Sequence, residues 1–142
     1  MYFLSKQKVL VCATVAIGLM VASCGESKIT QCNKLNQLIN QADAITKTAQ
    51  TGKPPTLRRA ASELEKVVLQ LKAVEVEDKK LQGLQASFVT LYTDLSKFFR
   101  KIADAIEKQD PAAIKTSLDF WPQARKKDIA LVKEINTYCG AK

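Results

Sequence analysis

The chain of 142 residues contains no histidine, and this absence excludes several kinds of site. A Ser-His or Cys-His nucleophile, a Glu-x-x-His di-metal centre and a Cys-x-x-Cys-His haem attachment motif all need the imidazole. The sequence also lacks a glycine-rich phosphate-binding loop. Its carboxylates alternate with lysines, as on solvated helix faces and turns; examples are Glu63, Glu65, Glu75, Glu77 and Asp78. We therefore expect no enzyme, no metal site and no cofactor other than a covalent lipid.

Glycine and proline are scarce, with five and four residues respectively, and β-branched runs are few. This composition favours helix over sheet. Hydrophobic residues make up 46% of the chain and charged residues 25%, which is ordinary for a globular domain. The length predicts a single domain with its own core.

The N-terminal segment has no charge between Val9 and Ala22, whereas Lys6 and Lys8 precede it. This apolar stretch is shorter than the roughly 20 residues that a membrane-spanning helix needs, and it suits the core of a signal peptide. We therefore predict that residues 1–23 are a leader.

Val21-Ala22-Ser23-Cys24 resembles the lipobox of bacterial lipoproteins. The resemblance implies cleavage before Cys24 and acylation of its thiol with diacylglycerol and fatty acids such as palmitate. Residues 24–28 would then be a lipidated tether of at most roughly 18 Å. It also implies anchoring on a non-cytoplasmic membrane face, either periplasmic, outer-membrane or thylakoid-lumenal. The alternatives are plain secretion with Cys24 as a free thiol, and an uncleaved anchor.

Two further cysteines, Cys32 and Cys139, lie near the two ends of the mature part. An exported chain meets an oxidising compartment, where paired cysteines normally form a disulfide. A redox-active pair is the alternative, but it usually needs close spacing or an activating histidine. We predict a structural disulfide between Cys32 and Cys139.

Apolar residues recur at three- and four-residue steps in four segments, which predicts four amphipathic helices. Their expected ranges are about 29–50, 57–74, 81–105 and 111–138. In the third segment, alternating steps of three and four residues form a heptad seam, which Tyr92, Phe99 and Ile106 widen. The seam residues are Leu81, Leu84, Phe88, Leu91, Leu95, Phe98, Ile102 and Ala105. Thr56 is the expected N-cap of the second helix, and Asp110-Pro111 the expected start of the fourth. Pro122 is expected to kink the fourth helix.

Four helices with short connections favour an all-α fold over residues 29–142, an up-down-up-down four-helix bundle whose first and last helices share the disulfide. A three-helix arrangement with merged or broken segments is the alternative.

The net charge is +8, and +6 once the leader with Lys6 and Lys8 is removed. In the predicted bundle six cations gather at the end away from the lipid: Lys53, Lys108 and the four candidate docking residues Arg58, Arg59, Arg100 and Lys101. They are either solvated decoration or a docking surface for an acidic protein partner. We expect no nucleic acid partner, because an exported protein rarely meets one.

Phe120-Trp121-Pro122 is the most unusual local sequence. Either Trp121 continues the core stripe, or the proline kink exposes Phe120 as a contact for a partner. Just beyond it, Arg125 and Asp128 occupy apolar positions of the heptad. We favour a shift of register through Ala124 and Leu131 over a partly buried ion pair, which is costly to desolvate.

Gln31-Cys32 and the closing Ile135-Asn136-Thr137-Tyr138-Cys139-Gly140 look like a group of uncharacterised exported cyanobacterial proteins. The resemblance implies an exported helical fold with paired terminal cysteines and no particular activity. Two functions remain. The first is an interaction or accessory subunit of a membrane assembly, and the second is a carrier for a small hydrophobic ligand inside the bundle.

Overall fold

The structure is a computed structural model that describes residues 25–140. The predicted leader and the predicted lipidation site Cys24 lie outside the described residues. Between Gly25 and Gly140 the chain is helical and contains no β-strand, so the all-α prediction is confirmed. The helices are α1 (Lys28–Ala49), α2 (Pro54–Ala73), α3 (Lys79–Glu107), α4 (Pro111–Leu118) and α5 (Phe120–Cys139). The last two make up the fourth predicted helix.

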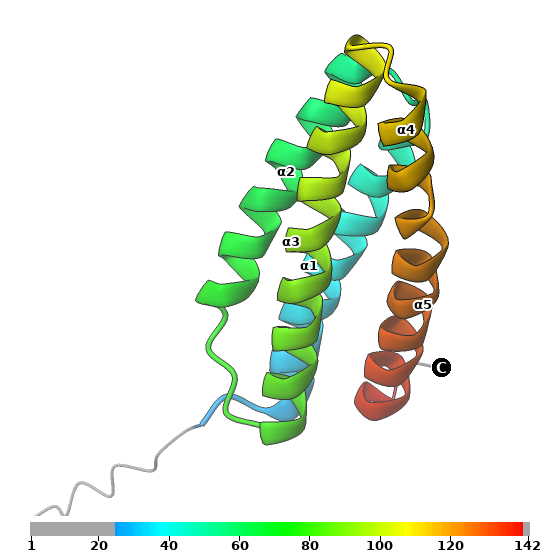
Figure 1. Ribbon diagram of the computed structural model, residues 1–142. Helices are drawn as coiled ribbons and strands as arrows, with labels where there is room; N and C mark the ends of the chain where they lie inside the picture. The colour runs from blue at the N-terminus through cyan, green and yellow to red at the C-terminus, as the bar shows by residue number, and fades with distance from the viewer. Residues whose placement is uncertain (1–24, 141–142) are drawn as a thin grey trace, which may run out of the picture.

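The helices lie side by side in an elongated bundle, with α4 and α5 following one another along one side (Figure 1). The most extensive packing is between α2 and α3, and α1 packs chiefly on α2. By contrast α4 packs on α3 and α5, and among the described helices its backbone does not approach that of α1. The start of α1 and the end of α5 lie at the same end of the molecule.

The heptad seam of α3 supplies much of the core. The predicted seam residues are all buried; they are Leu81, Leu84, Phe88, Leu91, Leu95, Phe98, Ile102 and Ala105. Burying a large apolar side chain contributes roughly 1.5–3 kcal/mol relative to leaving it exposed. Tyr92 and Phe99 widen the seam as predicted, because α3 contacts helices on more than one side.

Side-chain caps define where three of the described helices begin, and Ser27 caps the first, α1, by accepting from the amide of Thr30. Asp78 accepts hydrogen bonds from the amides of Lys80 and Leu81 at the start of α3. Asp110 caps α4 by accepting from the amide of Ala113, as predicted. These bonds satisfy amides that have no partner inside the helix.

The predicted N-cap at Thr56 is wrong. Helix α2 begins at Pro54, its N-cap is Lys53, and Thr56 lies inside the first turn. Pro54 and Pro55 can occupy this turn because amides there need no intrahelical acceptor.

Pro122 interrupts the fourth predicted helix, as its position suggests, but the interruption lies earlier. Helix α4 ends at Leu118, Asp119 stands alone, and Pro122 occupies the first turn of α5. The ring nitrogen of Pro122 cannot donate to the carbonyl of Leu118, and the ring crowds that carbonyl. The break therefore falls one turn before the proline.

Candidate interaction surface

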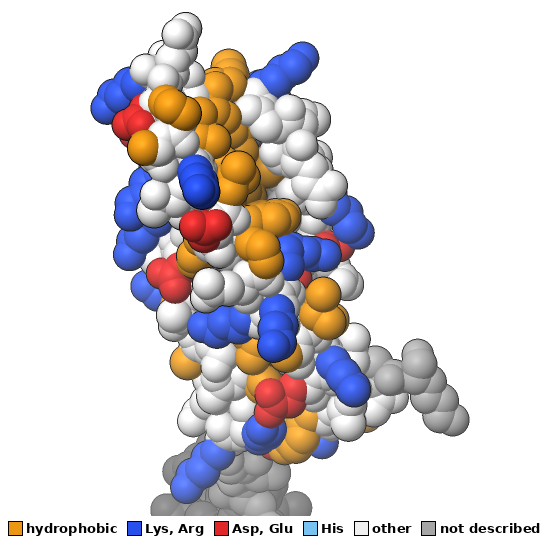
Figure 2. Space-filling model, turned by 45° about the vertical axis from the view of Figure 1, so that its right-hand side comes forward, with side chains coloured by type: hydrophobic (Ala, Val, Ile, Leu, Met, Phe, Trp, Pro, Cys, Tyr) orange, Lys and Arg blue, Asp and Glu red, His pale blue; other side chains and the backbone are white. Residues whose placement is uncertain are grey.

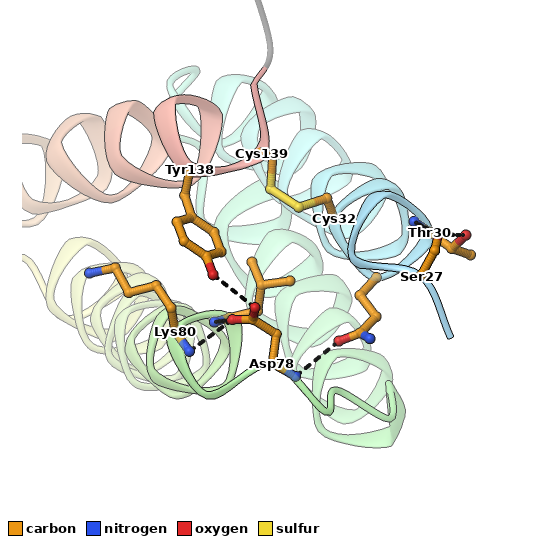
Figure 3. Close-up of a disulfide and its surroundings, with 9 residues drawn as sticks. Ser27, Thr30, Cys32, Asp78, Lys80, Tyr138 and Cys139 are labelled. Atoms are coloured by element: carbon orange, nitrogen blue, oxygen red, sulfur yellow. Dashed lines mark hydrogen bonds between the residues drawn. A yellow bond between two sulfur atoms is a disulfide. The ribbon is translucent and has the colours of Figure 1, made fainter. Parts of the chain in front are cut away.

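The end of the bundle next to residue 25 is closed by the predicted disulfide. Cys32 of α1 and Cys139 of α5 are bonded, with their Cα atoms 5.9 Å apart (Figure 3). Cys32 is buried and Cys139 packs against the core. The disulfide thus joins the first and last helices, which confirms the predicted pairing.

Polar contacts surround the disulfide. The hydroxyl of Tyr138 donates to Oδ2 of Asp78 at 2.8 Å (Figure 3). The Nζ of Lys28 lies 3.7 Å from the centre of the Tyr138 ring. The side chain of Gln31 accepts from the amides of Glu77 and Asp78 at 3.0 and 3.3 Å. Hydrogen bonds from the amide of Leu81 and from Tyr138 lower the pKa of Asp78. These contacts join α1, the α2–α3 connection and α5 at one end.

The first two residues of the predicted cationic cluster differ in their surroundings. Arg58 of α2 makes ion pairs of 2.6 Å with Asp104 and with Glu107 of α3. Hydrogen bonds to Glu107 and then Asp104 raise the pKa of Arg58. Arg59 is exposed and forms no ion pair with a described residue. Carboxylates of α3 therefore neutralise the charge of Arg58, whereas the side chain of Arg59 faces solvent.

The other two residues follow the same division. Arg100 of α3 binds Glu65 of α2 with two nitrogens, Nη2 at 2.9 Å from Oε2 and Nε at 3.1 Å from Oε1. This contact is the main cause that lowers the pKa of Glu65, and the hydroxyl of Ser96 supports it. Lys101 is exposed and unpaired among residues 25–140. Two of the four predicted docking cations, Arg58 and Arg100, thus form ion pairs that join α2 to α3.

Phe120 and Trp121 belong to an aromatic cluster on α3. The ring centre of Phe98 lies 5.2 Å from that of Phe120 and 5.9 Å from that of Trp121, and Phe99 lies 6.1 Å from Trp121. Aromatic pairs at such separations are favourable beyond their buried area. Both Phe120 and Trp121 are half-buried and pack against the core. Trp121 thus packs on the core stripe, and Phe120 keeps only part of its surface exposed, so its role as a partner contact stays a prediction.

An apolar groove of about 290 Å³ opens beside this cluster, at the end of the bundle opposite the disulfide. Its lining residues are Ala49, Gln50, Gly52, Leu57, Phe98, Phe99, Ile102, Ile106, Leu118 and Trp121. Figure 2 shows a band of hydrophobic side chains at this end, with Lys and Arg side chains at its margins. We call this feature the α1–α4 groove.

The α1–α4 groove exists because α4 covers the core poorly. None of its eight residues is buried, and Leu118 keeps 51% of its surface exposed. Gly52, with a positive φ of 68°, turns the chain away after α1, so nothing fills the space between the turn and α4. The sequence did not reveal this site, because its walls come from all five helices and the turn after α1, and no local pattern joins them.

Arg125 and Asp128 occupy apolar heptad positions of α5, and the structure shows both a shift of register and an ion pair there. Ala124 is buried, so the register shifts as expected. Arg125 nevertheless pairs with Asp128, with Nη1 3.2 Å from Oδ2, and lies 3.9 Å from Asp43 of α1. Burial raises the pKa of Asp128, while Arg125 lowers it. The pair lies at the edge of the core, where its side chains keep some contact with water.

No helix between residues 25 and 140 is both long and apolar enough to cross a membrane. Over the same range, no three His, Cys, Asp or Glu side chains lie close enough to share a metal ion. Comparison of the chain with family models, curated proteins and solved structures gives no match.

Proposed function

We propose that the chain is an exported lipoprotein, anchored through Cys24, that acts as an interaction or accessory subunit of a membrane assembly. It works by binding and not by catalysis. The observation that carries the proposal is the contrast between the two ends of the bundle. One end is closed by the disulfide and its hydrogen bonds, and the other presents an open apolar groove.

The proposal includes the up-down-up-down order of the helices. The connections at residues 50–53, 74–78 and 108–110 are short, which favours antiparallel neighbours. The disulfide between α1 and α5 agrees with an even number of passes along the bundle. In this order the anchor and the disulfide share one end, and the groove lies at the other.

The position of the anchor also supports an interaction role. Residue 25 lies three residues before α1, so a lipid on Cys24 would hold the disulfide end close to the bilayer. Helix α1 has 22 residues and is therefore about 33 Å long. The groove would then project away from the membrane, where extramembrane parts of an assembly can reach it.

The test is purification of the chain from membranes in mild detergent, with mass spectrometry of its N-terminus and of copurifying proteins. We expect a diacylglyceryl group on Cys24 and one reproducible complex. Cys24→Ala should lose the lipid and the membrane association. A wild-type chain that is soluble, unlipidated and always recovered alone would contradict the proposal.

The predicted cationic docking surface is part of the same test. Arg59→Glu with Lys101→Glu removes two exposed cations and leaves the ion pairs of Arg58 and Arg100 intact. A complex that depends on these cations is weakened by the double variant and by high salt. An unchanged complex would assign Arg59 and Lys101 to solvation alone.

A carrier role for a small hydrophobic ligand is the second candidate, and the apolar lining of the α1–α4 groove favours it. Such a carrier retains a stoichiometric lipid-like molecule through purification and melts at a higher temperature when that molecule is added. Native mass spectrometry of the purified chain distinguishes the two functions. A bound small molecule without a protein partner supports the carrier.

A further inference from the structure

The dimensions of the α1–α4 groove indicate what fits it. Its floor follows α3 from Phe98 to Ile106, a rise of about 12 Å. Apolar residues at positions i, i+4 and i+7 of a helix span about 10.5 Å, which is nearly the same length. The groove therefore matches two turns of an amphipathic helix lying along α3.

The volume of the groove favours side chains over an enclosed small molecule. At about 290 Å³ it lies just below the range of roughly 300–1,000 Å³ typical of small-molecule sites. The exposed side of Leu118 and the half-exposed ring of Trp121 form an open wall. A few apolar side chains that remain attached to a helix fit such a trough.

The surroundings of the groove are positively charged. Lys53 follows Gly52, Lys108 follows Ile106 by two residues, and Lys115 precedes Leu118 by one helical turn. All three lysines are exposed and form no ion pair within the described part of the chain. The carboxylates next to these residues in the sequence are Asp119, which is exposed, Asp110, which caps α4, and Glu107, which is paired with Arg58. With Glu107 counted against Arg58, the three lysines outnumber the two remaining carboxylates.

We propose that the α1–α4 groove binds an amphipathic helix from an acidic protein partner. Apolar residues of that helix lie against Phe99, Ile106, Leu118 and Trp121, and its carboxylates face Lys53 and Lys115. This inference rests on the proposed function, because it identifies the kind of partner that the subunit contacts. A lipid on Cys24 would anchor the opposite end of the bundle, which favours a protein partner over the chain's own bilayer as the occupant.

Trp121 is the only tryptophan of the chain, so its fluorescence reports directly on the groove. We would titrate the full chain, in vesicles of neutral phosphatidylcholine, with a peptide of about 15 residues that is helical when bound. This peptide carries leucine at positions i, i+4 and i+7 and glutamate on its other face. A second peptide replaces each glutamate by lysine.

We expect a saturable change in Trp121 emission with the acidic peptide and binding at least about ten-fold weaker with the basic one. Leu118→Glu should weaken binding of the acidic peptide by about ten-fold. Leu69→Glu is the matched control, because Leu69 is another exposed leucine (66%) on α2, away from the groove. Circular dichroism of both variants checks that they fold alike.

The charge requirement has its own pair of variants. The double variant Lys53→Glu with Lys115→Glu should bind the acidic peptide more weakly and the basic peptide more tightly. The control double variant, Lys66→Glu with Lys72→Glu on α2, should leave the binding of both peptides unchanged. Equal affinity for both peptides, no saturable response, or an unaltered response in Leu118→Glu would each overturn the proposal.

Purification from native membranes separates this inference from the proposed function. A complex recovered equally by the wild type and by Leu118→Glu leaves the interaction role standing and removes the groove from it. Loss of the complex in Leu118→Glu but not in Leu69→Glu supports both. If the wild type recovers no complex, the proposed function fails, and the peptide titration still decides what the groove binds.

Discussion

At the scale of single residues, the hydroxyl of Tyr92 is an unusual member of the core. The side chain is 2% exposed, and its oxygen has no hydrogen-bond partner among the described residues. Its ring packs against Phe88, with the centres 5.7 Å apart. A buried hydroxyl without a partner lowers stability, because it has lost its hydrogen bonds to water.

Replacing Tyr92 by Phe should therefore raise the free energy of unfolding by about 1 kcal/mol. The ring and its packing are kept, and only the unpartnered hydroxyl is removed. Urea denaturation followed by circular dichroism measures the change. Tyr138→Phe is the control, because it removes a hydroxyl that does donate a hydrogen bond and should not stabilise the chain. A less stable Tyr92→Phe would mean that the hydroxyl has a partner in solution.

Tyr92 also makes the free energy of unfolding depend on pH in the alkaline range. Burial is the main cause that raises the pKa of Tyr92 above its ordinary value of 10.0, and the charges of Asp128 and Asp43 add to it. The folded chain keeps this proton where the unfolded chain releases it, so the unfolding free energy falls as pH rises above about 10. Urea midpoints between about pH 8 and 11 should fall less steeply for Tyr92→Phe than for the wild type. Parallel curves would contradict a buried, protonated Tyr92.

At the scale of elements, α2 and α3 are joined by ion pairs as well as by their apolar faces. Arg100 and Glu65 keep 42% and 52% of their side-chain surfaces exposed, so their attraction is screened by water. We expect Arg100→Glu to lower the unfolding free energy by about 1 kcal/mol, since it sets two carboxylates side by side. The double variant Glu65→Arg with Arg100→Glu should recover most of this loss. Thermal melts at low and high salt test both, and a double variant no more stable than the single one would count against the pair.

Helix α4 covers little of the core, and the groove opens beside it for this reason. Leu118 and Ile114 lie on its apolar side, yet neither is buried, whereas α3 buries a residue in every turn. The break at Asp119 and the ring of Pro122 separate α4 from the better-packed α5. An element with few buried contacts opens more easily than the core helices. The partner helix that we propose would therefore cover the side of α4 that the bundle leaves open.

At the scale of the whole molecule, the disulfide spans nearly the entire described chain. Cys32 and Cys139 are 107 residues apart in sequence. Closing so long a loop restricts the unfolded chain, and the chain-entropy model gives an upper figure of about 4–5 kcal/mol. Cys32→Ser with Cys139→Ser should lower the unfolding free energy by up to this amount. Reduction of the wild type should have the same effect in urea titrations, and identical midpoints with and without reductant would contradict it.

The two ends of the molecule differ in how they are held. At the disulfide end, Lys80 of α3 pairs with Glu134 of α5, in addition to the contacts of Tyr138 and Gln31. At the opposite end, Arg58 joins α2 to α3, but α4 has no comparable tie to α1. The groove lies at this less constrained end. Binding there can adjust α4 without disturbing the disulfide end.

The sequence by itself determined the helices, the core stripe of α3 and the disulfide. Each of these follows from simple rules: apolar spacing along one helix, a cap such as Asp110, and the pair of cysteines near the two ends of the predicted mature part. The leader and Cys24 stay predictions, because they lie outside the described residues. The local rules misplaced the start of α2, because they favour Thr56 as an N-cap, whereas Lys53 precedes the helix and Pro54 and Pro55 occupy its first turn.

Only the tertiary structure decided the site. Arg58 and Arg59 are neighbours in sequence, but one faces the carboxylates of α3 and the other faces water. Leu57, Ile106 and Leu118 come together because the five helices and the turn after α1 meet at one end and leave a gap. Ion pairing and groove formation depend on contacts between residues far apart in the chain, and no spacing within one segment encodes them.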